Sequence, residues 1–213
     1  MLTITFRRFI ILLTLAALPL LAGSQCAFFF SSGGGSDDDD RSGLVVKVSD
    51  GQLVDAPVAG VSYQSGALTG VTGSNGEFRY EVGNAICFTI GDIPLGCAAQ
   101  GKTLITPVDL VENGTTETPA VINIARLLQS LDATPGEENI TIPKSVRAKA
   151  IRSNERLSST IEFLDYSDDP AFANAASQLL ATLTSEYGFT AVLVDADTAR
   201  EHMIRSLARY EER

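Results

Sequence analysis

The sequence predicts an α+β fold in which a small N-terminal antiparallel β-sandwich is followed by a C-terminal helical bundle packed against it. Two patterns along the 213 residues support this prediction. Between residues 43 and 110, glycines recur every few positions and separate short runs of alternating apolar and polar residues, as in antiparallel sheets. Between residues 111 and 213, apolar residues recur at helical spacing behind recognisable helix starts. Residues 43–110 are therefore assigned to a β-sandwich domain and residues 111–213 to a helical region.

The chain opens with the pattern of a secretory signal. Arg7 and Arg8 precede an apolar run over residues 9–22 that is interrupted only by a threonine and a proline. This run is too short for a membrane-spanning helix, which needs about 20 apolar residues. A basic start, a short apolar stretch and then small residues are typical of a signal peptide, which we assign to residues 1–25. The sequence thus predicts export.

Cys26 follows the signal at the place where bacterial lipoproteins carry the cysteine that is acylated and becomes the new N-terminus. Gln25 matches the usual lipobox poorly, and cleavage at the small residues before it would instead release a soluble protein. The next residues form a tether, assigned to 26–42, that is rich in serine, glycine and aspartate, as flexible spacers are. We expect lipidation of Cys26 and a cell-envelope location in the outer membrane, with a periplasmic or secreted protein as the alternative.

Three runs in the β half are predicted to be strands. The first covers residues 44–48 and is expected to end in a turn at residues 50–51. The second falls within residues 58–63. The third, residues 77–82, follows a turn at residues 73–76 and alternates apolar with charged residues, so one of its faces is expected in a core and the other in water.

Residues 86–97 are predicted to form a β-hairpin, for which two registers compete. A two-residue turn at residues 91–92 pairs the flanking isoleucines and suits the apolar pattern. A longer loop places Cys87 opposite Cys97 and suits a disulfide. Export favours the disulfide, which would contribute about 2–3 kcal/mol, and acylation of Cys26 would leave this even pair of cysteines. Two buried free thiols are the alternative.

Four helix starts are predicted in the second half of the chain. They lie at residues 118–119, Pro143, residues 168–170 and Asp195. At the first, Thr118 is expected to cap free N–H groups, and Pro119 suits the first helical position. The third helix is expected to end near Gly188. Residues 191–194 are too few for a helix and are expected to return as a strand.

The composition disfavours several classes of function. There are 26 acidic residues and 16 basic ones, giving a net charge of −10, which disfavours nucleic acid as a partner. The sequence has one histidine, and it has no Gly-x-Ser-x-Gly motif, no phosphate-binding loop and no cluster of metal ligands. No catalytic residue, metal site or cofactor is therefore predicted. His202, beside Met203 on or near an apolar helix face, is interpreted as a packing residue.

Several segments resemble known bacterial surface proteins. Residues 55–63 and 73–80 resemble the carboxypeptidase-regulatory-like (prealbumin-like) β-sandwich repeats. A set of Gram-negative envelope lipoproteins, mostly uncharacterised and some labelled adhesin-like, is similar to residues 88–96, 105–110, 120–132 and 194–203. The resemblance covers roughly residues 43–210. It implies a location and a fold, and it implies no reaction.

One departure from these relatives concerns a loop that resembles a calcium-binding loop. The relatives tend to follow their Leu-Asp pair with a loop rich in aspartate, glycine and asparagine. Here residues 132–139 offer few carboxylates at irregular spacing, whereas calcium takes about six to eight oxygen ligands. We expect an acidic turn that ends the helix.

These observations favour a binding or adhesion module over an enzyme. The expected protein is exported, anchored to the membrane through an N-terminal lipid, and presents loops that contact an envelope or cell-surface protein or glycan without catalysis. The alternative is a structural accessory subunit of an envelope complex. An accessory subunit would carry an exposed apolar patch on its helices.

Overall fold

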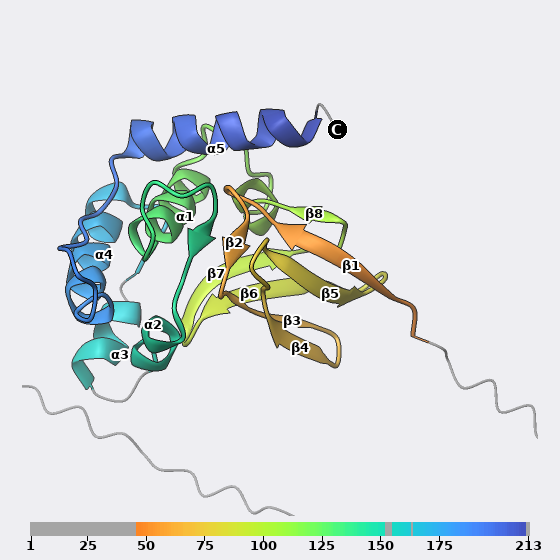
Figure 1. The fold of residues 1–213 in the computed structure, drawn as a ribbon, viewed down its shortest axis with the longest axis horizontal. Helices are drawn as coiled ribbons and strands as arrows, with labels where there is room; N and C mark the ends of the chain where they lie inside the picture. The colour runs from red at the N-terminus through yellow and green to blue at the C-terminus, as the bar shows by residue number, and fades with distance from the viewer. Residues whose placement is uncertain (1–45, 152–154, 163, 212–213) are drawn as a thin grey trace, which may run out of the picture. The chain divides into compact units, whose positions relative to one another are not determined.

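The strands lie mostly in the first part of the chain and the helices mostly in the second (Figure 1). The computed structural model describes residues 46–151, 155–162 and 164–211. All of these residues belong to one compact unit, Gly43–Arg213. The predicted α+β class is confirmed at this level. The predicted signal peptide, Cys26 and the tether lie outside the described residues.

The strands form two larger sheets and one small one. They are β1 Val48–Leu53, β2 Val58–Ala59, β3 Ser62–Ser65, β4 Leu68–Val71, β5 Glu77–Glu81, β6 Ile86–Ile90, β7 Ile93–Ala98, β8 Leu104–Ile105 and β9 Ile140–Thr141. The sheet orders are β5-β1-β8, β4-β3-β6-β7 and β2-β9. The expected all-antiparallel arrangement is wrong at two pairs, because β1 and β8 run parallel, as do β2 and β9. That the larger sheets stack as a β-sandwich stays a prediction, as do the domain boundaries.

The turn predicted at Asp50 and Gly51 is wrong. Both residues lie inside β1, where they pair with Arg79 and Phe78 of β5. A Cβ atom on Gly51 would lie 2.5 Å from the Phe78 ring. Glycine is therefore explained here by the aromatic ring that packs over the strand, and it does not mark a turn.

The alternation predicted for residues 77–82 holds as far as Tyr80 and then reverses. Phe78 and Tyr80 are buried, but Glu81 is buried as well and Val82 is exposed. The carboxylate of Glu81 accepts a hydrogen bond from the backbone N–H of Ala67 at 2.9 Å. A bonded carboxylate can take an inward position that the apolar pattern assigns to the opposite face.

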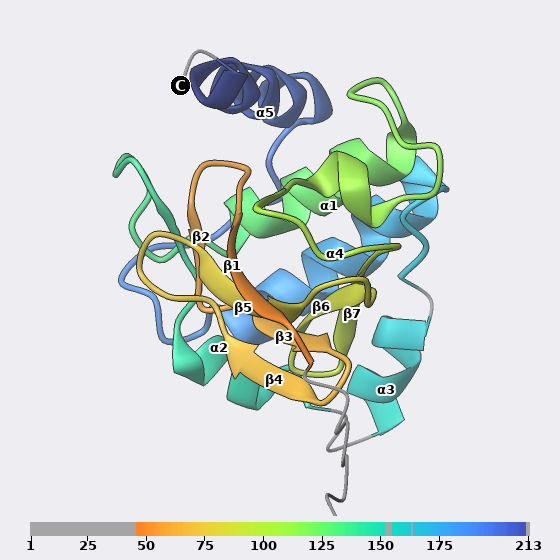
Figure 2. The same ribbon diagram turned by 90° about the vertical axis from the view of Figure 1, so that its right-hand side faces the viewer.

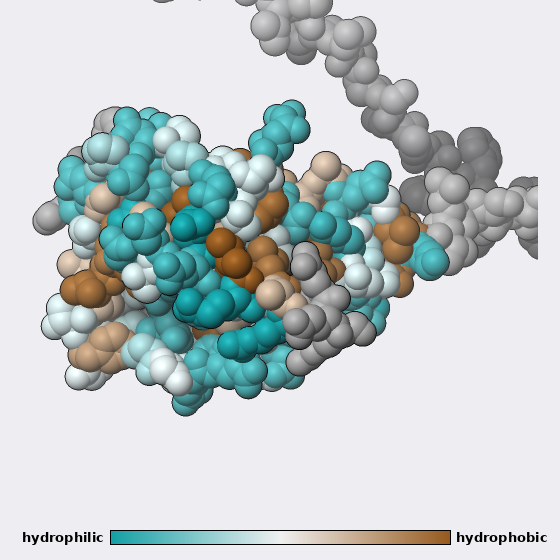
Figure 3. Space-filling view, turned by 90° about the horizontal axis from the view of Figure 1, so that it is seen from above, coloured by the Kyte–Doolittle hydropathy of each residue, from teal (hydrophilic) through white to brown (hydrophobic). Residues whose placement is uncertain are grey.

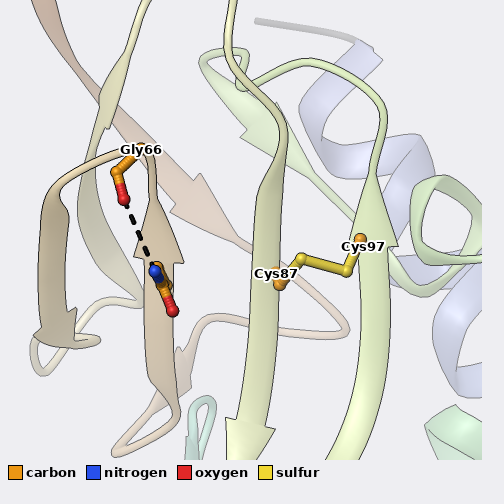
Figure 4. Close-up of a disulfide and its surroundings, with 4 residues drawn as sticks. Gly66, Cys87 and Cys97 are labelled. Atoms are coloured by element: carbon orange, nitrogen blue, oxygen red, sulfur yellow. Dashed lines mark hydrogen bonds between the residues drawn. A yellow bond between two sulfur atoms is a disulfide. The ribbon is translucent and has the colours of Figure 1, made fainter. Parts of the chain in front are cut away.

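The β6–β7 hairpin combines parts of both predicted registers. Next to the turn the isoleucines pair as one register requires, and farther along Cys87 pairs with Cys97 as the other requires. A β-bulge between the two segments takes up the difference. The paired residues are Ile90–Ile93, Thr89–Pro94, Phe88–Gly96 and Cys87–Cys97. Cys87 and Cys97 form a disulfide with an S–S distance of 2.06 Å (Figure 4).

The four predicted helix starts are confirmed. The helices are α1 Pro119–Ser130, α2 Lys144–Lys149, α3 Glu155–Glu162, α4 Asp169–Leu183 and α5 Ala196–Glu211, with the 3-10 helix η1 Pro107–Leu110. Thr118 does not cap α1 as expected, because its side chain instead accepts a hydrogen bond from the backbone N–H of Thr115. The third predicted helix, α4, ends at Leu183, before Gly188.

The strand predicted at residues 191–194 is wrong. This segment is irregular, and side chains of α1 satisfy its backbone. The N–H of Val194 donates to Ser130 Oγ at 2.9 Å, and the C=O of Val194 accepts from Arg126 Nε at 2.8 Å. Side-chain partners thus take the place of a sheet neighbour.

The main core joins the sheets to the helices, and α5 has a smaller core of its own. The main cluster holds buried residues from the sheets and from α1 to α4. A second cluster places Ala199 and Met203 of α5 on Val121 and Ala125 of α1. Figures 1 and 2 show α5 lying across α1 at one edge of the unit. Within the described ranges, no helix has both the length and the apolar character needed to cross a bilayer.

Candidate functional site

The candidate site is built around a buried carboxylate that joins three elements. Asp55 lies between β1 and β2, and its side chain is fully buried. Its Oδ2 accepts a hydrogen bond from Nε2 of Gln129, on α1, at 3.0 Å. Its Oδ1 lies 3.5 Å from Nδ1 of His202, on α5. Gln129 Nε2 also donates to the carbonyl oxygen of Ala199 at 3.2 Å, which ties α1 to α5.

The Asp55–His202 pair is incompletely satisfied. Asp55 Oδ1 and His202 Nδ1 are buried atoms without a hydrogen-bond partner in the described structure, so their interaction is electrostatic at 3.5 Å. Burial raises the pKa of the Asp55 carboxyl, and the imidazole of His202 and the amide of Gln129 offset part of this rise. The fold thus brings a buried carboxyl and an imidazole close together without a hydrogen bond between them.

A polar groove of about 240 Å³ adjoins this pair. It is bounded by the chain around β2, the turn before β5, the loop before β9 and the C-terminal part of α5. Its lining residues are Gln52, Ala56, Pro57, Asn75, Glu138, Asn139, Ser206, Arg209 and Tyr210. Ala56 follows Asp55 directly, and Ser206 lies one helical turn after His202. The buried pair thus supports two sides of the groove.

Hydrogen bonds between loops hold the groove in shape. Gln52 Nε2 donates to the carbonyl oxygen of Asn75 at 2.5 Å, and Asn139 Nδ2 donates to the carbonyl oxygen of Ser74 at 3.0 Å. Arg209 Nη1 lies 3.6 Å from a carboxylate oxygen of Glu138. The lining therefore offers carboxamides, hydroxyls and one ion pair, a set that suits polar, uncharged groups of a ligand.

The acidic loop after α1 is organised by its first carboxylate. Asp132 Oδ1 accepts hydrogen bonds from the backbone N–H groups of Thr134 at 3.1 Å and Thr141 at 2.9 Å. This carboxylate therefore fixes the path of the chain from α1 to β9. In the parts that the structure describes, no group of three or more His, Cys, Asp or Glu side chains is placed to hold a metal ion.

The surface around α5 is mostly hydrophilic. Viewed from the side of α5, hydrophobic residues are scattered in small separate groups (Figure 3). Among the residues described within helices, Ile204 of α5 is the large hydrophobic side chain that is exposed. Single exposed residues of this kind are ordinary on protein surfaces.

The sequence predicts only part of this arrangement. Of the predicted site residues, Cys87 and Cys97 bridge β6 and β7, and neither lines the groove. The apolar helix face predicts a packing role for His202, and the structure places it beside a buried carboxylate. Asp55 does not stand out in the sequence, because it is one of 26 acidic residues and lies 74 positions before Gln129. No local signal identifies such a partner.

Comparison with known proteins finds partial relatives. "Putative lipoprotein YghJ" of Escherichia coli O78:H11 (strain H10407 / ETEC) is 37% identical over 103 residues, and "Putative lipoprotein AcfD homolog" of Escherichia coli strain K12 is 36% identical over 103 residues. The matched segment covers 47% of this chain but 6% of each relative. No family model and no solved structure matches. The chain is thus similar, over about half its length, to a small part of much longer proteins named as lipoproteins.

Proposed function

We propose that this protein is an exported, lipid-anchored protein of the cell envelope that acts as a binding or adhesion module without catalysis. The lipoprotein names of its relatives support the envelope location, together with the signal pattern and Cys26. The cross-strand disulfide suits an oxidising compartment. The proposal includes the outer membrane as the location and the prealbumin-like β-sandwich as the family's fold.

The observation that carries the binding role is the polar groove beside Asp55. Several chain segments outside the helices and one helix meet there, and hydrogen bonds between the segments fix their relative positions. Adaptable polar side chains on a rigid frame are the usual arrangement of a recognition surface. The partner is an envelope or cell-surface molecule, a glycan or a protein, that presents uncharged polar groups to the groove.

The lipid anchor is tested by replacing its cysteine. Cys26→Ser should move the protein from the membrane fraction to the soluble fraction, because a thioether-linked lipid can no longer form. The mass of the natively processed wild type should equal residues 26–213 plus acyl chains, and it should rise by about two hydrogen atoms on reduction of the disulfide. Ser31→Ala, within the same tether, is the control and should stay with the membrane. A wild-type chain that starts at Gln25 without lipid would overturn the anchor.

The groove is tested by two substitutions at its lining. Asn139→Ala and Tyr210→Ala should each weaken binding by about tenfold, because each removes polar groups at the proposed contact surface. The assay measures binding of the purified protein to intact Gram-negative cells and to a glycan microarray, which separates glycans from protein partners. Asn174→Ala, an exposed asparagine on α4 outside the groove, is the matched control. Unchanged binding by both groove variants, with unfolding midpoints equal to that of the wild type, would rule out this surface.

A further inference from the structure

The helix α5 forms one wall of the groove and packs on α1. Its apolar contact with α1 is the small cluster around Ala199 and Met203. Its ion pairs with the rest of the unit, Arg200–Glu117 and Arg209–Glu138, involve carboxylates that are largely exposed. Exposed ion pairs contribute little to stability. The buried polar contacts of α5 are therefore the ones that can change its docking most.

The contact between Asp55 and His202 is a buried polar contact that joins α5 to the rest of the unit. A charged carboxylate that is removed from water is costly unless a cation or hydrogen bonds compensate it. Asp55 has one hydrogen bond, from Gln129, and its other oxygen faces the chain's one histidine at 3.5 Å. The imidazole side chain is about one-third exposed, at 36%, although its Nδ1 atom is buried.

We propose that Asp55 and His202 form a pH-sensitive latch that docks α5 while the pair holds a proton and releases it when that proton is lost. Release would move the α5 wall away from the groove. This second step rests on the proposed function of the groove, whereas the latch itself does not.

The other charged groups near the latch are engaged elsewhere. On α1, the residue that faces Asp55 is the neutral Gln129. The charged groups packed around this part of the unit form pairs or backbone bonds of their own: Arg126 with Asp169, Arg200 with Glu117, Arg205 with Glu201, Arg209 with Glu138, and Asp132 with the backbone of Thr134 and Thr141. In the described residues, His202 is the basic side chain found within 4 Å of Asp55.

The direction of the pH response follows from the burial of Asp55. Burial raises the pKa of this carboxyl in the folded protein above its ordinary value of 3.8. A raised carboxyl pKa means that the fold favours the protonated form, so the stabilisation is complete below the ordinary pKa and is lost as pH rises through the raised one. Docking of α5 should therefore weaken as the pH rises above the raised pKa of the Asp55 carboxyl.

Hydrogen–deuterium exchange of the full processed chain tests the latch without any ligand. Exchange rates of α5 peptides, corrected for the intrinsic pH dependence, should rise about tenfold from acid to mildly alkaline pH. Peptides of β6 are the internal reference and should stay protected, because global unfolding would expose both. Glu201→Gln, on the same helix, is the control and should keep the wild-type profile.

Two variants decide the outcome. Asp55→Asn is nearly isosteric and neutral, can still accept from Gln129, and should keep α5 protected at alkaline pH. His202→Gln removes the imidazole that shares a proton with the buried carboxylate, and should speed the exchange of α5 about tenfold at neutral pH. An Asp55→Asn profile identical to that of the wild type would overturn the latch. The latch and the groove can also fail separately. If α5 shows the expected pH response but the Asn139→Ala and Tyr210→Ala variants bind like the wild type, the latch stands and only the proposed binding function is overturned.

Discussion

Replacing Gly96 by alanine should destabilise the oxidised protein by about 3 kcal/mol. Gly96 sits beside the bulge of the β6–β7 hairpin with φ of +129°, a conformation that L-residues adopt at a cost of about 1–2 kcal/mol. A Cβ atom there would also overlap the carbonyl oxygen of Leu110, the last residue of η1. Backbone cannot move aside as a side-chain end can, so this overlap adds about 1–3 kcal/mol.

A second glycine separates the two causes. Gly83 also has a positive φ, +93°, but nothing lies within 4 Å of the position that its Cβ would take. Gly83→Ala should therefore cost about 1 kcal/mol from backbone conformation alone. Equilibrium denaturation of both variants under oxidising conditions gives the comparison. If Gly96→Ala and Gly83→Ala lower the free energy of unfolding by the same amount, the role assigned to the contact with η1 is contradicted.

The hairpin also shows where sequence patterns lose their predictive power. The apolar alternation and the cysteine spacing each predict one register, and each register holds over only part of the hairpin. The bulge that reconciles them lies next to Gly96, where the strand passes close to the backbone of Leu110. That contact depends on a segment outside the hairpin, so no pattern within residues 86–97 could place the bulge.

Helix starts are predictable because their signals are local. A proline with a preceding polar residue marks α1 and α4, and the structure confirms both. The sequence pattern does not predict the short helix α3, since its buried apolar residues are only Leu157 and Ile161, a single pair four positions apart. Residues 191–194 have the apolar character of a strand, but their backbone partners are side chains of α1, which a strand pattern cannot reveal.

The candidate site lies beyond sequence reasoning for the same physical reason. Asp55, Gln129 and His202 come from a turn and two helices that meet only in the folded unit. Apolar periodicity identifies the face of α5 that carries Met203 and leaves the neighbouring His202 as a packing residue. The same periodicity cannot predict that the Asp55 carboxylate lies next to His202, because burial of an acidic residue depends on tertiary contacts.

Replacing Arg126 by methionine should destabilise the fold by about 3 kcal/mol, although it keeps an apolar stem of similar length. Arg126 is buried at 8% exposure and lies 5.5 Å from the centre of the Phe172 ring. Its guanidinium donates to the carbonyl oxygen of Val194 at 2.8 Å and to Asn123 Oδ1 at 2.9 Å. Methionine removes these donors and leaves the Asn123 acceptor unpaired in a buried place and the Val194 acceptor unpaired in a partly buried one. An unpaired buried group costs about 1–3 kcal/mol.

The ion pair with Asp169 is the smaller part of this effect. Arg126 Nη1 lies 2.6 Å from Asp169 Oδ1, but the aspartate side chain is 60% exposed and therefore well solvated. Asp169→Asn should cost less than about 1 kcal/mol. Arg205→Met, which removes an exposed arginine paired with Glu201 on the same helix, should cost no more than about 0.5 kcal/mol.

Chemical denaturation of the three variants separates the possibilities. If the hydrogen bonds to Val194 and Asn123 dominate, Arg126→Met should lower the free energy of unfolding much more than Asp169→Asn or Arg205→Met does. A loss in Asp169→Asn close to that in Arg126→Met would show instead that the ion pair dominates, which contradicts the prediction. Because Val194 leads directly into α5, the Arg126→Met variant should also lose protection in α5 before β6 exchanges. Arg126 would then hold the start of the helix whose middle is held by His202.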